Sequence, residues 1–168
     1  MVSYDIPVIS NIPGAAAYIL KSWHANGIAY WQTGLPFTVT NSVANQNVPG
    51  VTSDRPDRVA AWAASSPSLN MWFNTAAFAP QVKGTAGNEA PNQLRGPHQR
   101  SLNLSLVRDF ALRESLRLQF RVEGFNVTNT ANFALPDGII DDNTYGAITS
   151  TATNASPRQF QLALKLLF

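Results

Sequence analysis

The sequence QFQLALKLLF, residues 159–168, ends the chain and decides its fold class. Large apolar side chains occupy every second position, namely Phe160, Leu162, Leu164, Leu166 and Phe168. The positions between them hold Gln159, Gln161, Ala163 and Lys165, with Leu167 as the exception. A period of two over ten residues predicts a β-strand with one apolar face and one polar face.

Two stretches upstream share this plan. In the first, leucines at positions 102, 104 and 106 alternate with serine and asparagine. In the second, Leu116, Leu118, Phe120 and Val122 alternate with Arg117, Gln119, Arg121 and Glu123. We expect residues 102–110, 116–126 and 159–168 to form consecutive antiparallel strands, the first two joined by a tight turn around residues 112–115.

A soluble β-sandwich would show the same alternation, with its apolar face as a core. The lengths of the connections therefore have to distinguish a sandwich from a membrane barrel. Further strands are predicted at residues 2–6, 20–33 and 37–41. The links then alternate between longer and tight, at residues 7–19, 34–36, 42–100, 112–115 and 130–157. Short periplasmic turns and longer extracellular loops are typical of outer-membrane barrels.

The predicted fold is therefore all-β, with about six antiparallel strands of an outer-membrane-type β-barrel and long loops on one side. If Phe168 lies at the periplasmic rim, both tight turns lie on that side too. Six strands cannot close a membrane barrel, since about eight is the minimum. We therefore expect a partial barrel, in which residues 42–100 form a long extracellular-type loop. Within that loop, residues 57–64 could form a short helix.

Composition excludes several other classes. Charged residues make up 13% of the 168 residues, against about 25% in soluble domains. The sequence contains no run of 18 consecutive apolar residues, so we expect no transmembrane helix. The net charge is +2 and the basic residues are dispersed, so we expect no nucleic-acid partner.

Two tryptophans suggest a membrane depth. Trp23 and Trp31 share one face of the predicted strand and lie about 26 Å apart along it. That separation is close to the spacing of the two aromatic girdles of a barrel. The alternative is a pair of tryptophans at the two ends of a soluble core strand.

Residues capable of catalysis or metal binding are sparse. The chain has two histidines, His24 and His98, and no cysteine, whereas zinc sites use three or four ligands. A triad of His98 with Ser65, Ser66 or Ser68 is conceivable, but no nucleophile-elbow motif supports it. The acidic residues 137–143 lack the spacing of a calcium-binding loop. We therefore expect no enzyme, no catalytic residues, no metal and no cofactor.

Several motifs in order resemble one family. They are SYDIP (3–7), GLPFTV (34–39), SDRP (53–56), WFNTAAF (72–78), LRGP (94–97), LQFRVEGFN (118–126), NTANF (129–133) and PRQFQLALK (157–165). Together they are similar to the C-terminal barrel of Oar-like TonB-dependent receptors, which carry a carboxypeptidase-regulatory-like domain.

The resemblance implies that residues 1–168 are the C-terminal part of a barrel of about 22 strands with a plug. It also implies transport across the bacterial outer membrane with energy delivered through TonB. The implied partners are the rest of the parent barrel and its plug, outer-membrane lipid and the barrel-assembly machinery.

Two sets of residues then take on roles. The apolar row of the last strand, ending on an aromatic residue, resembles an assembly signal: Phe160, Leu162, Leu164, Leu166 and Phe168. The polar row of the preceding strand is expected to face the lumen: Arg117, Gln119, Arg121 and Glu123.

Two other functions remain open at this point. The chain could be a free-standing β-rich protein that self-associates or binds a partner through open sheet edges. It could also be a small serine hydrolase, which would require a pocket joining a histidine, a serine and a carboxylate. An apolar sheet face that points outward would favour the barrel.

Overall fold

The computed structural model describes residues 1–7, 14, 19–41 and 54–168. Among these residues it contains nine β-strands, in one five-stranded sheet and two two-stranded sheets. The chain divides into two compact units. The sheet unit comprises Met1–Trp31, Arg100–Ala131 and Ser156–Phe168, and the loop unit comprises Gln32–Gln99 and Asn132–Ala155.

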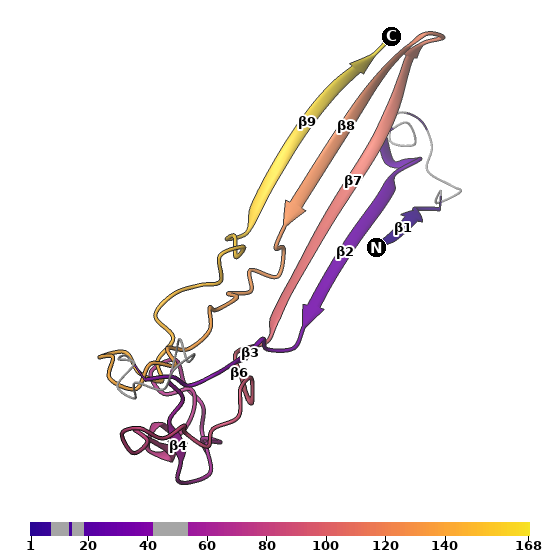
Figure 1. Cartoon of the computed structure of the whole chain (residues 1–168). Helices are drawn as coiled ribbons and strands as arrows, with labels where there is room; N and C mark the ends of the chain where they lie inside the picture. Colours follow the sequence, from indigo (N-terminus) through magenta and orange to yellow (C-terminus); the bar gives the residue numbers. More distant parts are fainter. Residues whose placement is uncertain (8–13, 15–18, 42–53) are drawn as a thin grey trace. The chain divides into compact units, whose positions relative to one another are not determined.

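The five-stranded sheet has the order β1-β2-β7-β8-β9. Its strands are β1 (Val2–Asp5), β2 (His24–Gln32), β7 (Gln99–Arg113), β8 (Leu116–Phe125) and β9 (Gln159–Leu167). Neighbouring strands run in opposite directions, as Figure 1 shows. Within the described residues, the outer edges of β1 and β9 pair with no further strand.

The all-β fold class predicted from the sequence is confirmed, and so are the three C-terminal strands. Glu114 and Ser115 alone connect β7 to β8. In the register of the sheet, Val122 of β8 lies opposite Leu106 of β7 and Leu162 of β9. Because side chains alternate between faces along a strand, this register gathers the apolar residues of the three strands on one face.

The predicted strand at residues 37–41 is wrong. Here the structure has only β3 (Pro36–Phe37), which pairs with β6 (Leu94–Arg95), and an isolated bridge from Thr40 to Ile139. The alternating Phe37 and Val39 are buried in the core of the loop unit, so their pattern reflects a small core and not a long strand. The sheet has five strands where about six were expected.

This difference changes the connections. Since β2 pairs directly with β7, residues 34–36 form no tight turn between sheet strands and belong to a longer connection, residues 33–98. That connection and residues 126–158 both join strands at one end of the sheet. The β7–β8 turn and Phe168 lie at the other end, seen together in Figure 1. The link between β1 and β2 starts at the same end of the sheet as the β7–β8 turn. The alternation of link lengths had predicted this link at the opposite end.

The loop unit has a core of its own. Six buried residues form it: Phe37, Val39, Phe73, Ala77, Phe78 and Leu94. Phe73 lies at its centre, with ring centroids 5.7 Å from Phe37 and 5.9 Å from Phe78. Short elements surround it, namely β4 (Asp57–Arg58) paired with β5 (Phe78–Ala79), and the 3-10 helix η1 (Thr75–Ala77). β4 begins where a helix over residues 57–64 was expected, so that prediction is wrong.

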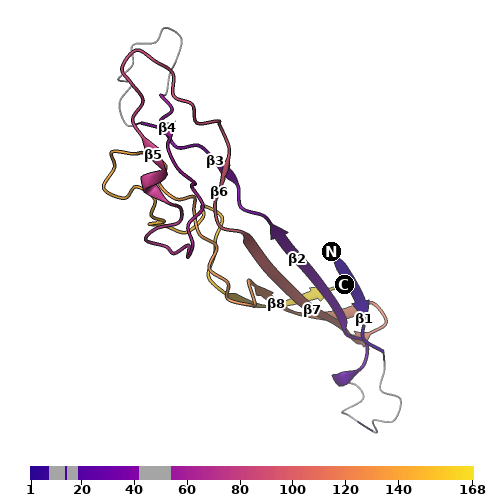
Figure 2. The same cartoon turned by 90° about the horizontal axis from the view of Figure 1, so that it is seen from below.

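Backbone hydrogen bonds hold the two segments of the loop unit together. Thr40 N donates to Gly138 O over 2.9 Å, and Ile140 N donates to Thr40 O over 3.0 Å. Trp72 N donates to Gly146 O, and Ile148 N donates to Leu69 O. Residues distant in the sequence therefore fold as one body; Figure 2 shows the strands of this unit from a second direction.

Nowhere in the described ranges is there a helix with the length and apolar character needed to cross a membrane.

Candidate functional site

The apolar face of the five-stranded sheet is its most unusual surface. On β9, Phe160, Leu162 and Leu164 keep 68%, 70% and 69% of their surface exposed. The adjoining rows continue the face through Leu118, Phe120 and Val122 of β8 and Leu104 and Leu106 of β7. Soluble monomers rarely expose a contiguous apolar surface of more than a few hundred Å². This face therefore requires a nonpolar environment.

The two tryptophans lie on the same face. Val2 of β1 pairs with Gly27 of β2, and a Cβ at Gly27 would lie 3.3 Å from the Leu104 side chain, so the odd positions of β2 share the apolar face. Trp31, near the long-connection end of β2, is 77% exposed. Trp23, just before the other end, packs edge-on against Phe120 with ring centroids 6.1 Å apart.

Arg108 is the exception on this face, since it pairs with Phe120 within the apolar rows. Its residue surface is only 4% exposed. The guanidinium lies 4.5 Å from the Phe110 ring centroid and 5.9 Å from that of Trp23, and it donates to Ile19 O. Cation–π contacts and a carbonyl acceptor thus compensate the buried charge. Its even position among leucines was the signal that the sequence reading missed.

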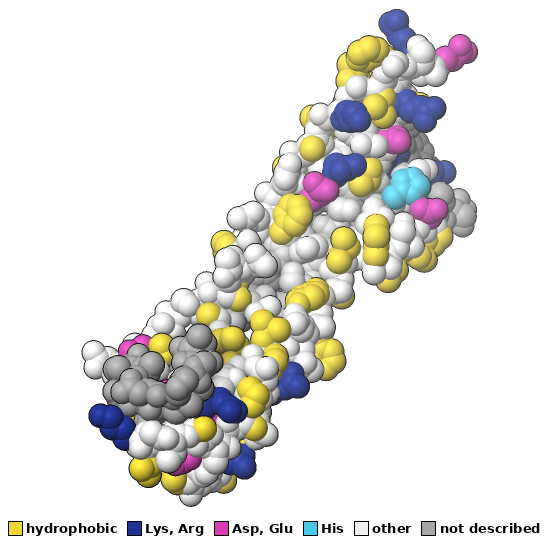
Figure 3. Space-filling model, in the orientation of Figure 1, with side chains coloured by type: hydrophobic (Ala, Val, Ile, Leu, Met, Phe, Trp, Pro, Cys, Tyr) yellow, Lys and Arg dark blue, Asp and Glu magenta, His cyan; other side chains and the backbone are white. Residues whose placement is uncertain are grey.

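The opposite face is polar. The four residues predicted to face the lumen, Arg117, Gln119, Arg121 and Glu123, all lie on it, because they occupy alternate positions of β8. Gln119 Nε2 donates to Asp109 Oδ1 over 2.9 Å, and Arg121 lies 3.6 Å from the Glu123 carboxylate. On the face seen in Figure 3, several charged side chains lie toward the end of the sheet that carries the β7–β8 turn.

A shallow pocket of about 320 Å³ lies on this polar face. Its lining is half polar and half apolar: Asn26, Asn103, Ser105, Arg121 and Glu123, with Met1, Ile28, Leu104, Val107 and Phe125. Asn26 Nδ2 donates to Ser105 Oγ over 3.4 Å, so β2 and β7 both present polar groups here. The surface can accept hydrogen bonds and charged groups from a partner or from water.

Asn126 fixes the turn at the end of β8. It is 6% exposed and has a φ of 47°, a left-handed conformation that asparagine tolerates better than most residues. Its Nδ2 donates to Thr130 O over 3.0 Å and to Ser156 O over 2.9 Å, and its Oδ1 accepts from Thr130 N over 3.1 Å. Its own N–H donates to Asn103 Oδ1 over 2.9 Å. One side chain thus joins the turn to the segment before β9.

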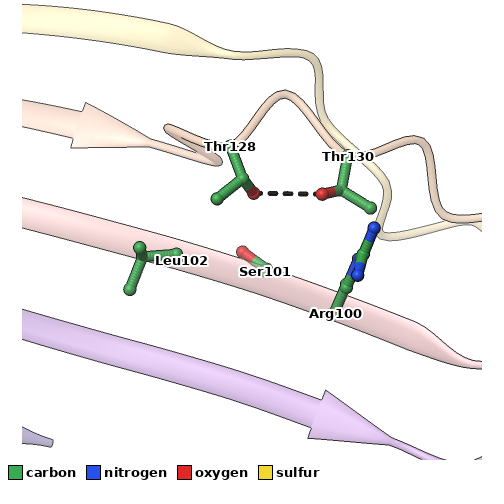
Figure 4. A pocket seen from close by; sticks show the side chains of 5 residues that line it. All are labelled: Arg100, Ser101, Leu102, Thr128 and Thr130. Carbon is green, nitrogen blue, oxygen red and sulfur yellow. Dashed lines mark hydrogen bonds between the residues drawn. The ribbon is translucent and has the colours of Figure 1, made fainter.

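A second pocket, of about 290 Å³, lies between this turn and the start of β7, as Figure 4 shows. Five residues line it: Arg100, Ser101, Leu102, Thr128 and Thr130. The hydroxyl oxygens of Thr128 and Thr130 lie 3.0 Å apart and are hydrogen-bonded. The pocket therefore combines a guanidinium, several hydroxyls and one apolar wall.

The residues considered for catalysis do not come together. His24 Nδ1 lies 2.5 Å from Asp5 Oδ1, but both side chains are largely exposed at the turn end of the sheet. Among the described residues, His98 is exposed and forms no hydrogen bond with Ser65, Ser66 or Ser68. No group of three or more potential metal ligands occurs in the part of the chain that the structure describes.

The acidic loop at residues 137–143 has a structural explanation. Asp137 Oδ1 accepts from Ile139 N over 2.9 Å, and Oδ2 accepts from the Thr144 hydroxyl over 2.6 Å. Asp137 therefore stabilises its own turn, in the way that aspartates commonly do.

An antiparallel sheet with one exposed apolar face, one polar face and, among the described residues, two unpaired edges is typical of part of a β-barrel wall. The comparison with known families agrees. The model of the outer membrane beta barrel domain matches residues 1–161, and the chain belongs to this family. It is a protein of the bacterial outer membrane. No curated protein and no solved structure matches the chain significantly.

Proposed function

We propose that this chain is the C-terminal segment of the barrel of a TonB-dependent outer-membrane transporter. The observation that carries the proposal is the sheet itself, whose exposed apolar face suits lipid while its opposite face is polar. The open edges of β1 and β9 suit pairing with the remaining strands of a larger barrel. The ordered motifs of the Oar-like receptors support the more specific assignment.

In this proposal the polar face lines the lumen. Arg117, Gln119, Arg121 and Glu123 would contact water, the plug or the passing substrate, and no catalytic step would take place in this chain. The ion pair between Arg121 and Glu123 and the hydrogen bond from Gln119 to Asp109 of β7 suit a surface that keeps its side chains ordered while exposed to water.

Cysteine labelling tests the assignment of the faces, because the chain contains no cysteine of its own. Gln119→Cys and Leu118→Cys place a thiol at adjacent positions on opposite faces of β8. In outer-membrane vesicles, a water-soluble maleimide should label the first variant and spare the second. Equal labelling of both positions would contradict the barrel orientation.

The same approach tests the transport step. In a TonB-energised receptor, plug movement should change the access of the maleimide to Arg121→Cys. The labelling rate should therefore depend on TonB and on the proton-motive force. If neither the removal of TonB nor a protonophore changes the labelling rate, the proposed TonB-dependent transport is contradicted, while the assignment to a barrel wall stands.

The assembly signal is tested at the last two residues. Phe168 is 98% exposed and follows the end of β9, so its deletion removes little packing from the chain. If the insertion machinery reads this aromatic residue, deleting Phe168 should lower the amount of protein in the outer membrane. Leu167→Gln, on the polar face opposite Arg117, is the matched control and should leave that amount nearly unchanged.

Outside the membrane, we expect the isolated chain to self-associate. Its apolar face and the two strand edges that are unpaired in the described residues would then pack against the same surfaces of other copies. Light scattering in buffer without detergent should show oligomers or aggregates. A stable monomer would favour a free-standing β protein with a private core.

A further inference from the structure

The pocket of about 320 Å³ on the polar face is a groove above β7. Its floor contains two small polar residues of that strand, Asn103 and Ser105. Ile28 of β2 and Phe125 of β8 line it from the two strands on either side of β7, which lie next to it in Figure 1. Short side chains on the middle strand, between longer ones on its neighbours, leave this depression open.

The two walls are apolar. Ile28 keeps 48% of its surface exposed and Phe125 keeps 39%, and Val107 lines the same pocket from β7. Apolar side chains from three strands therefore converge on a face that is otherwise rich in charged and amide groups. Covering them with the apolar side chains of a ligand would contribute favourable free energy.

The polar floor is ordered by hydrogen bonds of its own. Asn103 Oδ1 accepts from Asn126 N over 2.9 Å, which fixes the side-chain amide in one orientation. Ser105 Oγ accepts from Asn26 Nδ2 over 3.4 Å, and its hydroxyl hydrogen can still donate. Groups that are ordered in advance bind a ligand without the entropic loss of ordering them.

The spacing and the charge of the groove suit an extended peptide. Asn103 and Ser105 are two positions apart on one strand, about 6.6 Å, and the same repeat separates alternate residues of any extended chain. Arg121 and Glu123 lie 3.6 Å apart at the groove and present both charges with no net charge. A neutral, dipolar backbone matches such a surface better than an anion or a cation does.

The groove lies nearer the long connections than the β7–β8 turn. Phe125 is the last residue of β8, and Asn103 lies near the start of β7. The long connections are extracellular in such barrels. A substrate that enters the lumen from outside would therefore pass this part of the wall early.

We propose that the groove binds an extended peptide segment of the substrate that the parent barrel transports. The peptide amides bond to Asn103 and Ser105, and its apolar side chains pack against Ile28 and Phe125. The volume is at the lower end of the range of ligand sites, roughly 300–1,000 Å³, so the segment is short. This inference rests on the proposed transport function, because it requires both a lumen-facing groove and a passing substrate.

Protection of a thiol in the groove tests the proposal. Ser105→Cys is made in the full-length protein in outer-membrane vesicles, and the probe is the capped pentapeptide acetyl-alanyl-leucyl-alanyl-phenylalanyl-alanine amide. At saturation the peptide should slow maleimide labelling of this thiol at least fivefold. Gln119→Cys is the matched control, because it lies on the same face outside the groove, toward the turn end. Its labelling rate should change less than twofold.

The walls are tested in the Ser105→Cys protein. Ile28→Ser and Phe125→Ser should each raise the peptide concentration for half-maximal protection at least fivefold, because each removes apolar contact area. Leu167→Ser is the matched control, since it removes an apolar side chain from the same face, opposite Arg117 and away from the groove. Its half-maximal concentration should change less than twofold. Far-UV circular dichroism of each variant checks that the sheet is retained.

The other outcomes would overturn the inference in distinguishable ways. If Ser105→Cys is labelled but the peptide does not protect it, the peptide site is wrong and the barrel wall stands. If Ser105→Cys is labelled no faster than Leu104→Cys, the lumen orientation and the proposed function fail as well. Equal protection by maltopentaose would exclude a peptide-specific site. Labelling that appears only after deletion of the plug would assign the groove to the plug and not to the substrate.

Discussion

In the loop unit, Phe73 and Val39 keep 2% and 0% of their surface exposed, whereas Leu162 and Leu164 in the sheet unit keep 70% and 69%. All seven buried hydrophobic residues of the described chain belong to the loop unit. The sheet, with its longer strands and stronger apolar pattern, has none. The loop unit supplies its own nonpolar environment, and the sheet requires one from outside. Hydrophobic pattern and hydrophobic core are therefore separate properties in this chain.

Truncating the centre of the loop core should have the largest effect. Phe73→Ala removes a fully buried ring and should destabilise the loop unit by about 3–5 kcal/mol. Hydrogen exchange should rise in residues 54–98 and 132–155 and stay unchanged in β8 and β9. A parallel rise in the strands would show that the two units do not unfold separately. Leu69→Ala, at an exposed position of the same unit, serves as the control.

A charge on the apolar face should have the next largest effect, and only in lipid. Leu162→Arg places a guanidinium midway along β9, which costs about 2–4 kcal/mol at the centre of a bilayer. Urea unfolding of the protein in phosphatidylcholine vesicles should show the loss. Val82→Arg, at a 71% exposed position of the loop unit, should leave the midpoint unchanged. If both variants unfold alike, lipid does not cover the apolar face.

The turn after β8 should depend on the Asn126 side chain and not on its backbone angle. Asn126→Gly allows the positive φ but removes the side-chain hydrogen bonds, and should cost about 1–3 kcal/mol. Asn129→Gly is the matched control, since Asn129 has a φ of 50° and an exposed side chain. Its stability should stay close to that of the unaltered protein. The same urea experiment distinguishes them.

The smallest expected effect concerns Glu89, which is 1% exposed in the loop unit. Its burial raises the pKa of the carboxyl above its usual range, while Arg58, 3.9 Å from the carboxylate, and Arg55 lower it. The charge of Glu89 also acts on Tyr145, where burial followed by the charges of Asp137 and Glu89 raises the pKa of the phenol. The site of Glu89 thus favours the protonated form of the carboxyl.

The raised pKa of Glu89 makes the stability of the loop unit depend on pH. Because the pKa is higher in the folded state than in the unfolded chain, the protonated form stabilises the loop unit below the unfolded value of about 4.3. This contribution is lost as the pH rises through the folded value. Glu89→Gln should therefore flatten the pH dependence of hydrogen exchange in residues 54–98 and leave the unit at least as stable at pH 7. An unchanged pH profile in the variant would exclude Glu89 as its source.

The sequence was informative where a pattern was long and repeated. Large apolar residues occupy every second position over residues 101–106 of β7, 116–123 of β8 and 159–166 of β9, and the predicted strands match the observed ones within a few residues at each end. Residues 37–41 show why short patterns fail. Phe37 and Val39 alternate too, yet both turn into the small core around Phe73. Two alternating apolar residues can serve a strand or a local core equally well.

The candidate sites divide in the same way. Alternation alone placed four residues on one face, because successive side chains of a strand point to opposite faces of the sheet. They are Arg117, Gln119, Arg121 and Glu123. The pocket at Arg100 was not predictable. The even position of Arg108 indicated the apolar face, but the contacts that bury its side chain were not predictable. Each depends on a segment distant in sequence, the turn at Thr128–Thr130 in one case and the residues near Trp23 in the other.

By itself the sequence determined which faces of the sheet are apolar and polar, since a period of two is a local property of the backbone. Tertiary structure alone decided that β2 pairs with β7, that residues 33–41, 54–98 and 132–155 form one unit, and that Asn126 binds Ser156. These pairings join segments separated by many residues. They depend on the free energy of burial and hydrogen bonding that is gained once distant segments have come together. A local sequence pattern contains no information about that gain.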